Sequence, residues 1–228
     1  MKHKNLLLIT CLSVTACVLH AVMLNTPFNL YLYTSAVKVV LFVLFPLIYF
    51  KASKDLSLKD LFKINSGKTE KKYLKFSLIF GFGVFGLIIL FYIILRPFLD
   101  NEMIIGALES FGITPANFIF VFIYIVLINA ALEELFFRGF IFTGLHKAGF
   151  KLYAHVFSAL LFSVYHVTIL DSALSIGMFL FCVFGLFVSG LIFNFFVLKC
   201  KNILGALIVH ISANFALNLI VLSYLLFK

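Results

Sequence analysis

The sequence has little of what a soluble protein needs at its surface. It contains no tryptophan and only nine acidic residues among 228, and charged residues make up 12%, about half of the share in soluble domains. The four cysteines are scattered and form no CxxC pair, which argues against a disulfide framework and against a zinc ribbon. Such a composition excludes a disordered chain and argues against an ordinary soluble domain.

Long apolar runs take the place of the missing charges. Hydrophobic residues make up 64% of the chain, and the mean hydropathy is +1.16. Runs of this length cross a bilayer as helices, and their unbroken hydrophobicity excludes the alternating pattern of barrel strands. The sequence predicts an all-α fold, a polytopic bundle of transmembrane helices in which residues 1–228 form a single integral membrane domain. The expected spans are 5–24, 29–50, 76–95, 117–144, 152–170, 174–198 and 203–227.

The distribution of lysine predicts how these seven spans are oriented. The net charge is +9, and loop 51–75 alone carries eight lysines. If the N-terminus is cytoplasmic, this loop and most other basic residues fall inside, as the positive-inside rule requires, and the C-terminus lies outside. Segment 97–116 is then an outside segment, expected to form a short helix and a turn. Basic loops between spans indicate contact with the lipid bilayer, and no nucleic acid partner is expected.

The expected location is the cell membrane, with the chain as a multi-pass protein. The abundance of phenylalanine and lysine favours an AT-rich genome and hence a bacterial plasma membrane. The first run also resembles a signal peptide, because Met1–Lys4 is basic and Val14–Cys17 resembles a lipobox. We favour an uncleaved first span, and the remaining topology is the same in either case.

The fourth expected span contains three charges within six residues. Glu134 and Arg138 are four residues apart and can pair on one face of a helix. Glu133 lies about 100° around the helix and has no such local partner. Because a buried carboxyl is costly in a bilayer, Glu133 is a candidate general base. The structural alternative is an ion pair that locks neighbouring helices, for which one glutamate would be enough.

Polar residues also follow a helical period in two later spans. Ser158, Phe162 and His166 share one face of the fifth span, and His210, Asn214 and Asn218 share one face of the seventh. Two acids, two imidazoles and an amide are the groups needed to activate water and to stabilise a tetrahedral oxyanion. Glutamate and histidine are also zinc ligands, although the sequence has no HExxH motif. These residue types therefore allow hydrolysis with or without a metal.

In this order the motifs resemble the CPBP family, also called Abi. The motifs are Glu133-Glu134-x-x-x-Arg138, Phe162-x-x-x-His166 and His210-x-x-x-Asn214. The family comprises type II CAAX prenyl proteases together with bacteriocin-processing and self-immunity proteins. The resemblance covers 115–220, the expected core, whereas 1–114 adds only spans and the basic loop.

The resemblance implies an intramembrane endopeptidase that cuts a peptide or protein substrate near the cytoplasmic side. Glu133 and His166 resemble the pair that activates water, and His210 and Asn214 the pair that stabilises the oxyanion. Glu134 and Arg138 complete the first motif. A metal-free mechanism without a cofactor is favoured, and zinc held by Glu133, His166 and His210 is the alternative. In a bacterium, a signalling or bacteriocin-type peptide is a more natural substrate than a prenylated protein.

Two other functions remain open from the residues alone. A catalytically silent regulator or immunity protein would act by binding and would tolerate the loss of Glu133. A proton-coupled transporter also uses buried acids and histidines, but the sequence shows no repeated half. If the protein is a protease, we expect the fourth, fifth and seventh spans to pack around one polar cavity open to the cytoplasmic half. We expect Lys38 to snorkel or to pair within the bundle.

Overall fold

The computed structural model describes residues 2–26, 30–53, 56–64, 67–167 and 174–226, and most of these residues are helical, with no strand among them. Two segments of the fourth span are π-helical, η2 (Tyr124–Asn129) and η3 (Glu134–Phe142), and η1 (Arg96–Phe98) is a 3₁₀ turn. The α-helices are α1 (Lys2–Leu24), α2 (Tyr31–Ser53), α3 (Leu58–Phe62), α4 (Lys68–Leu95), α5 (Asn101–Ser110), α6 (Phe118–Ile123), α7 (Ala130–Glu133), α8 (Thr143–Lys147), α9 (Lys151–Tyr165), α11 (Ile176–Cys200) and α12 (Leu204–Leu226).

Six helices of the described residues are long and apolar enough to span a membrane, so the chain is a multi-pass membrane protein with an all-helical fold. They correspond to six of the seven expected spans. The fifth expected span, 152–170, contains α9, which has 15 residues and ends at Tyr165. At 1.5 Å per residue α9 is about 22 Å long, less than the roughly 30 Å of a hydrocarbon core. Residues 168–173 of that expected span lie outside the described residues.

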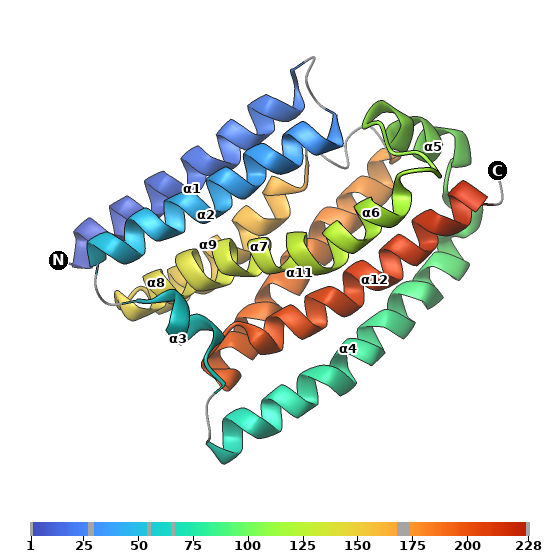
Figure 1. Cartoon of the computed structure of the whole chain (residues 1–228). Helices are drawn as coiled ribbons and strands as arrows, with labels where there is room; N and C mark the ends of the chain where they lie inside the picture. Colours follow the sequence, from blue (N-terminus) through green and yellow to red (C-terminus); the bar gives the residue numbers. More distant parts are fainter. Residues whose placement is uncertain (1, 27–29, 54–55, 65–66, 168–173, 227–228) are drawn as a thin grey trace.

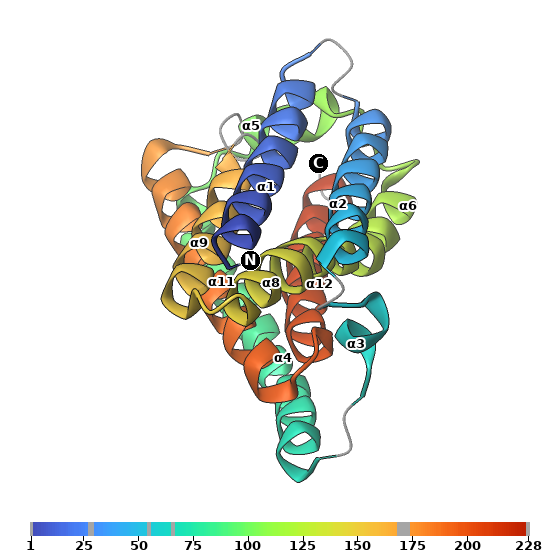
Figure 2. The ribbon, with the colours of Figure 1, turned by 90° about the vertical axis from the view of Figure 1, so that its left-hand side faces the viewer.

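The connections between helices gather at two ends of the bundle (Figure 1). The N-terminus, α3, the turn after α8 and the turn between α11 and α12 lie at one end, and α5 and the C-terminus lie at the other. Helices α1 and α2 pack against each other and both contact η3 of the composite fourth span. From the left-hand side of Figure 1 they lie in front, with α6 visible beside α2 and α8 below α1 (Figure 2). The basic segments thus share one end, the arrangement that the positive-inside rule requires, although the orientation itself stays a prediction.

The expected loop 51–75 is partly helical. Helix α3 lies within it, and α4 begins at Lys68 rather than at 76, because Gly67 ends the loop and Glu70 sits favourably in the first turn of a helix. The loop is tied to the bundle where the backbone N–H of Ile203 donates to the carbonyl of Leu61 at 3.0 Å. The expected helix and turn in 97–116 are confirmed as α5, whose N-cap is Asp100.

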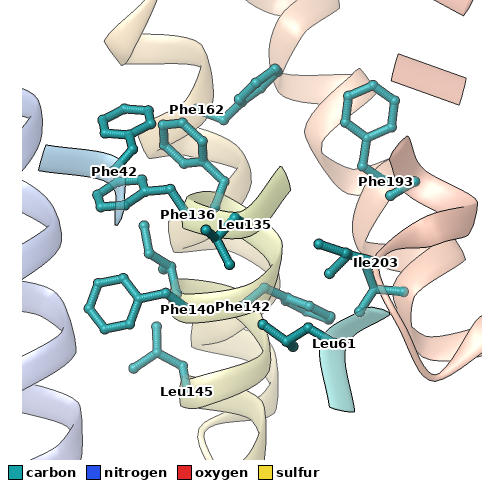
Figure 3. Packing of buried hydrophobic residues seen from close by; sticks show 14 of the residues in the cluster. Phe42, Leu61, Leu135, Phe136, Phe140, Phe142, Leu145, Phe162, Phe193 and Ile203 are labelled. Atoms are coloured by element: carbon teal, nitrogen blue, oxygen red, sulfur yellow. The ribbon is translucent and has the colours of Figure 1, made fainter. Parts of the chain in front are cut away.

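Phenylalanine side chains fill the core around η3 (Figure 3). Phe136, Phe137 and Phe140 are fully buried, and Phe42 of α2 stacks on Phe136 with ring centroids 4.1 Å apart. Lipid is as apolar as these side chains, so close packing rather than exclusion from water holds the helices together. The π-helical turns leave carbonyls available to neighbouring helices, and the hydroxyl of Ser158 in α9 donates to the Phe137 carbonyl at 2.8 Å. This bond fixes α9 against the fourth span.

Candidate active site

The two glutamates lie where α7 meets η3, in the middle of the composite fourth span. His166 is the C-cap of α9, and His210 lies in the first half of α12. The side chains of Glu133 and Glu134 are 2% and 0% exposed, and that of His210 is 5% exposed. The structure therefore brings together charged residues from three spans in a place screened from solvent, as the motifs predicted.

Glu133 is not an unpaired carboxyl. The Lys38 ammonium, which extends from α2, lies 2.5 Å from its Oε1 atom, and both side chains are buried. The Asn129 side-chain amide donates to the same oxygen at 3.0 Å, and Lys38 also donates to the Asn129 carbonyl oxygen. The expectation that Glu133 lacks a partner considered only its own helix and was wrong. The expectation that Lys38 pairs within the bundle is confirmed.

The second oxygen of Glu133, Oε2, faces the two histidines. It lies 3.9 Å from Nε2 of His166 and 3.5 Å from Nε2 of His210. Among the described residues no group donates a hydrogen bond to Oε2. A separation of 3.9 Å is too long for a direct hydrogen bond. Glu133 therefore presents one oxygen that is held by partners and one that points at imidazole nitrogens.

The backbone fixes the ring of His166. Its Nδ1 atom lies 2.7 Å from the carbonyl of Phe162. A carbonyl can only accept, so Nδ1 carries the hydrogen, and Nε2 of the neutral ring is then an acceptor. The bond also satisfies one of the free carbonyls at the end of α9. Nε2 of His166 and Oε2 of Glu133 are therefore two acceptors that face each other.

Glu134 lies on the other side of the cluster. Its Oε1 atom is 3.3 Å from Nη1 of Arg138, which confirms the predicted i,i+4 pair, and 2.9 Å from Nδ1 of His210. The Arg138 guanidinium is fully buried and lies 4.2 Å from the ring centroid of Phe162 and 4.7 Å from that of Phe193. Aromatic faces stabilise a buried cation, so these rings take the place of water around Arg138.

The two asparagines of α12 form hydrogen bonds to backbone. Asn214 donates from Nδ2 to the carbonyl of Ile125 in η2 at 3.1 Å, and Asn218 donates to the carbonyl of Asn214 at 2.8 Å. Asn214 therefore docks α12 on the fourth span and has a second N–H on the same amide nitrogen. Its role in the site remains a prediction.

Glu133 and His166 lie at matching depths because of where their helices end. If the fourth span ended at residue 144, as expected, Glu133 would lie several ångströms nearer to the turn between the two helices than His166 does. The span continues to Lys147, and α9 begins at Lys151. Both residues are then about 20 Å along their helices from the connecting turn. This longer fourth span accounts for their contact.

A polar cavity at the cluster was expected. Two hollows formed by the described residues lie elsewhere. One of about 300 Å³ lies between α4 and α11, and another of about 380 Å³ lies beside Tyr49 and Gly144. None of the predicted site residues lines either hollow. The cluster itself is nearly closed, and His166, whose side chain is 18% exposed, is its most accessible acid–base group.

The zinc alternative does not fit this arrangement. In the described part of the chain, no three histidine, cysteine, aspartate or glutamate side chains are placed so that they could hold a metal ion. The Lys38 ammonium on Glu133 adds a positive charge that would repel a divalent cation.

These features define a class, a multi-pass membrane protein with two acids and two imidazoles buried between its helices. Residues 115–216 match the family model for type II CAAX prenyl endopeptidase Rce1-like proteins. The match confirms the resemblance drawn from the motifs and supports a CAAX-type intramembrane protease in general, with a peptide substrate at a membrane. No curated protein and no solved structure gives a significant match.

Lys38 was missed as a member of the site, and it lies outside the matched region. The sequence did contain a signal for it. Lys38 is a single charge inside an otherwise apolar span, and the spacing of charges gave Glu133 no oppositely charged partner on its own helix. Charges buried in a bilayer are paired, so the two unpaired charges could have been assigned to each other.

Proposed function

We propose that this protein is an intramembrane endopeptidase that hydrolyses a peptide bond by means of water activated by Glu133 and His166. The observation that carries the proposal is the pair of acceptors, Oε2 of Glu133 and Nε2 of His166, which face each other at 3.9 Å. A water molecule has two O–H groups and can donate one to each acceptor.

In this mechanism the oxygen of that water attacks the carbonyl carbon of the substrate. Glu133 takes one proton of the water as the new C–O bond forms, and the carbonyl oxygen becomes an oxyanion. When the intermediate collapses, the C–N bond breaks and the leaving amine takes a proton from Glu133. The products are a carboxylic acid and an amine, and Glu133 is again a carboxylate.

His210 and Asn214 are the proposed donors to the oxyanion. Nδ1 of His210 is held by the Glu134 carboxylate at 2.9 Å, so this nitrogen carries a hydrogen. Nε2 can then donate only from the imidazolium form, whose positive charge would stabilise the oxyanion while Arg138 balances Glu134. Asn214 would donate through its second N–H. These roles require α12 to present both groups to the substrate, as one face of its helix permits.

The substrate proposed is a peptide that enters from the cytoplasmic side of a bacterial plasma membrane. The basic segments gather at one end of the bundle, the end that also contains the turn between α8 and α9. The positive-inside rule supports this end as the cytoplasmic one. A signalling or bacteriocin-type peptide suits a bacterial chain, and the family match makes a prenylated CAAX peptide the first substrate to test. The proposed mechanism includes no cofactor.

The test uses purified protein in lipid vesicles with fluorescence-quenched peptides, one of which ends in a prenylated CAAX sequence. Glu133→Gln keeps the size of the side chain but removes the proton acceptor, and we expect the turnover number to fall at least about 100-fold. Glu102→Gln, in exposed α5, is the matched control and should cleave normally. Full activity of Glu133→Gln would refute the proposed mechanism and favour a regulator that acts by binding.

A further inference from the structure

Among the described residues, Lys38 is the charged partner of Glu133 that comes from outside the region matched by the family model. It extends from α2 and crosses to the α7–η3 junction of the fourth span. Its own side chain is 7% exposed. The ammonium lies 4.9 Å from the ring centroid of Tyr165 and 5.4 Å from that of Phe42, so two aromatic rings also contact it.

A carboxylate at this depth needs a counter-charge. Without one, a buried carboxyl becomes neutral, and a protonated carboxylic acid cannot take a proton from water. Arg138 is already committed to Glu134, and His166 is committed through Nδ1 to a backbone carbonyl. Among the described residues, Lys38 is the cation in contact with Glu133. Lys38 therefore supplies the charge that lets Glu133 act as a base.

The contact between Lys38 and Glu133 also determines which carboxylate oxygen of Glu133 is available to a reacting molecule. Lys38 and Asn129 both bind Oε1, and Asn129 in turn accepts from Lys38. These three side chains form a closed triangle of hydrogen bonds, which prevents the carboxylate from rotating. Oε2 is thereby turned toward His166 and His210, at 3.9 and 3.5 Å. A carboxylate held by one oxygen presents the other to a reacting molecule in a fixed direction.

We infer that Lys38 is a positioning residue of the hydrolytic site, which keeps Glu133 ionised and directs its Oε2 atom at the attacking water. This inference rests on the proposed endopeptidase function. It makes α2, from the N-terminal part of the chain, a component of the reaction centre. It also assigns to Asn129 the supporting role of fixing the ammonium and the carboxylate relative to each other.

The test compares Lys38→Met with Lys199→Met in the vesicle assay, using a peptide that the wild-type protein cleaves. Methionine keeps the length of the side chain and removes its charge. Lys199 is a matched control because its ammonium also lies over two aromatic rings, at 5.5 and 5.6 Å, but at the end of α11 away from Glu133. We expect kcat of Lys38→Met to fall about 10- to 100-fold with KM unchanged, and Lys199→Met to stay within about twofold of wild type.

Restoring a cation at position 38 distinguishes a positioning role of Lys38 from a purely structural one. Lys38→Arg restores a cation, and added propylamine restores one to Lys38→Ala, so each should recover part of the lost kcat. If Lys38→Met does not fold, Lys38→Gln, which keeps a polar head, replaces it. Unchanged kcat in the charge-free variants would overturn the inference, as would a loss that neither arginine nor the amine restores. A wild-type protein that cleaves no peptide would instead refute the proposed function and this inference with it.

Discussion

The two neighbouring glutamates occupy different surroundings although they are adjacent in sequence and equally buried. Each has one oxygen that binds a cation together with a second donor. For Glu133 the cation is Lys38, which comes from another helix, and the second oxygen faces imidazole nitrogens. For Glu134 the cation is Arg138, four residues further along the same span, in contact with the rings of Phe162 and Phe193.

This difference separates a structural half of the cluster from a reactive half. Arg138 is planar, always charged and packed between aromatic rings, so its pair with Glu134 is rigid and belongs to the core. The ammonium of Lys38 is a compact point charge held by Asn129 as well as by Glu133, so it keeps its place while the charge of Glu133 changes during a reaction. His210 contacts both glutamates and so connects the two halves.

The largest expected effect is on stability, and it differs between the two halves. Glu134→Gln leaves the fully buried Arg138 cation without its carboxylate, and the cost should be about 3–5 kcal/mol. Glu133→Gln leaves Lys38, whose amine can release its proton, so we expect a smaller cost of about 1–3 kcal/mol. The measurement is the free energy of unfolding in mixed micelles, followed by circular dichroism.

Equal losses in the two variants would contradict the division into two halves. The stability cost expected here for Glu133→Gln is larger than the cost that the sequence alone would suggest. From the motif, Glu133 has no partner, and its replacement by glutamine would hardly affect folding. The contact with Lys38 changes this, because the substitution now removes one member of a buried ion pair.

Local patterns in the sequence predicted the structural half well. The pair of Glu134 and Arg138 follows from their spacing on one helix, and the polar stripe of α9 follows from steps of four residues. The spans themselves followed from hydropathy, with boundaries that moved where helices extended into polar sequence, as α4 does at Lys68. These features depend on residues a few positions apart.

The reactive half depends on contacts that local patterns do not contain. Lys38 and Glu133 are 95 residues apart, and only the packing of α2 on the fourth span brings them together. The bond from Ser158 to the Phe137 carbonyl likewise joins α9 to η3, two elements that no local pattern relates to each other. The match in depth between Glu133 and His166 required the true end of the fourth span at Lys147.

A smaller effect is expected from the bond that holds α9 against η3. Ser158→Ala removes a donor to the Phe137 carbonyl, which should cost about 1 kcal/mol and lower turnover several-fold, because the bond helps to place His166 beside Glu133. Ser163→Ala is the matched control, since its hydroxyl donates to the Val183 carbonyl in α11 and not to the fourth span. Its stability should fall by a similar amount with turnover unchanged. Equal turnover losses in both variants would show that the Ser158 bond has no special effect on the reactive half.

The smallest expected effect is that of metal ions on the cleavage rate. Here we expect no change in the rate. The reactive half contains a cation on Glu133, and no three ligand side chains of the described residues are placed to hold a metal. Cleavage should therefore survive a strong chelator, and added zinc should not increase it. The rate is measured on the same vesicles before and after chelation, with a zinc peptidase as the positive control for metal removal. Activity that the chelator abolishes and zinc restores would mean that Lys38 leaves Glu133 in the working enzyme, and Glu133, His166 and His210 would then be ligands.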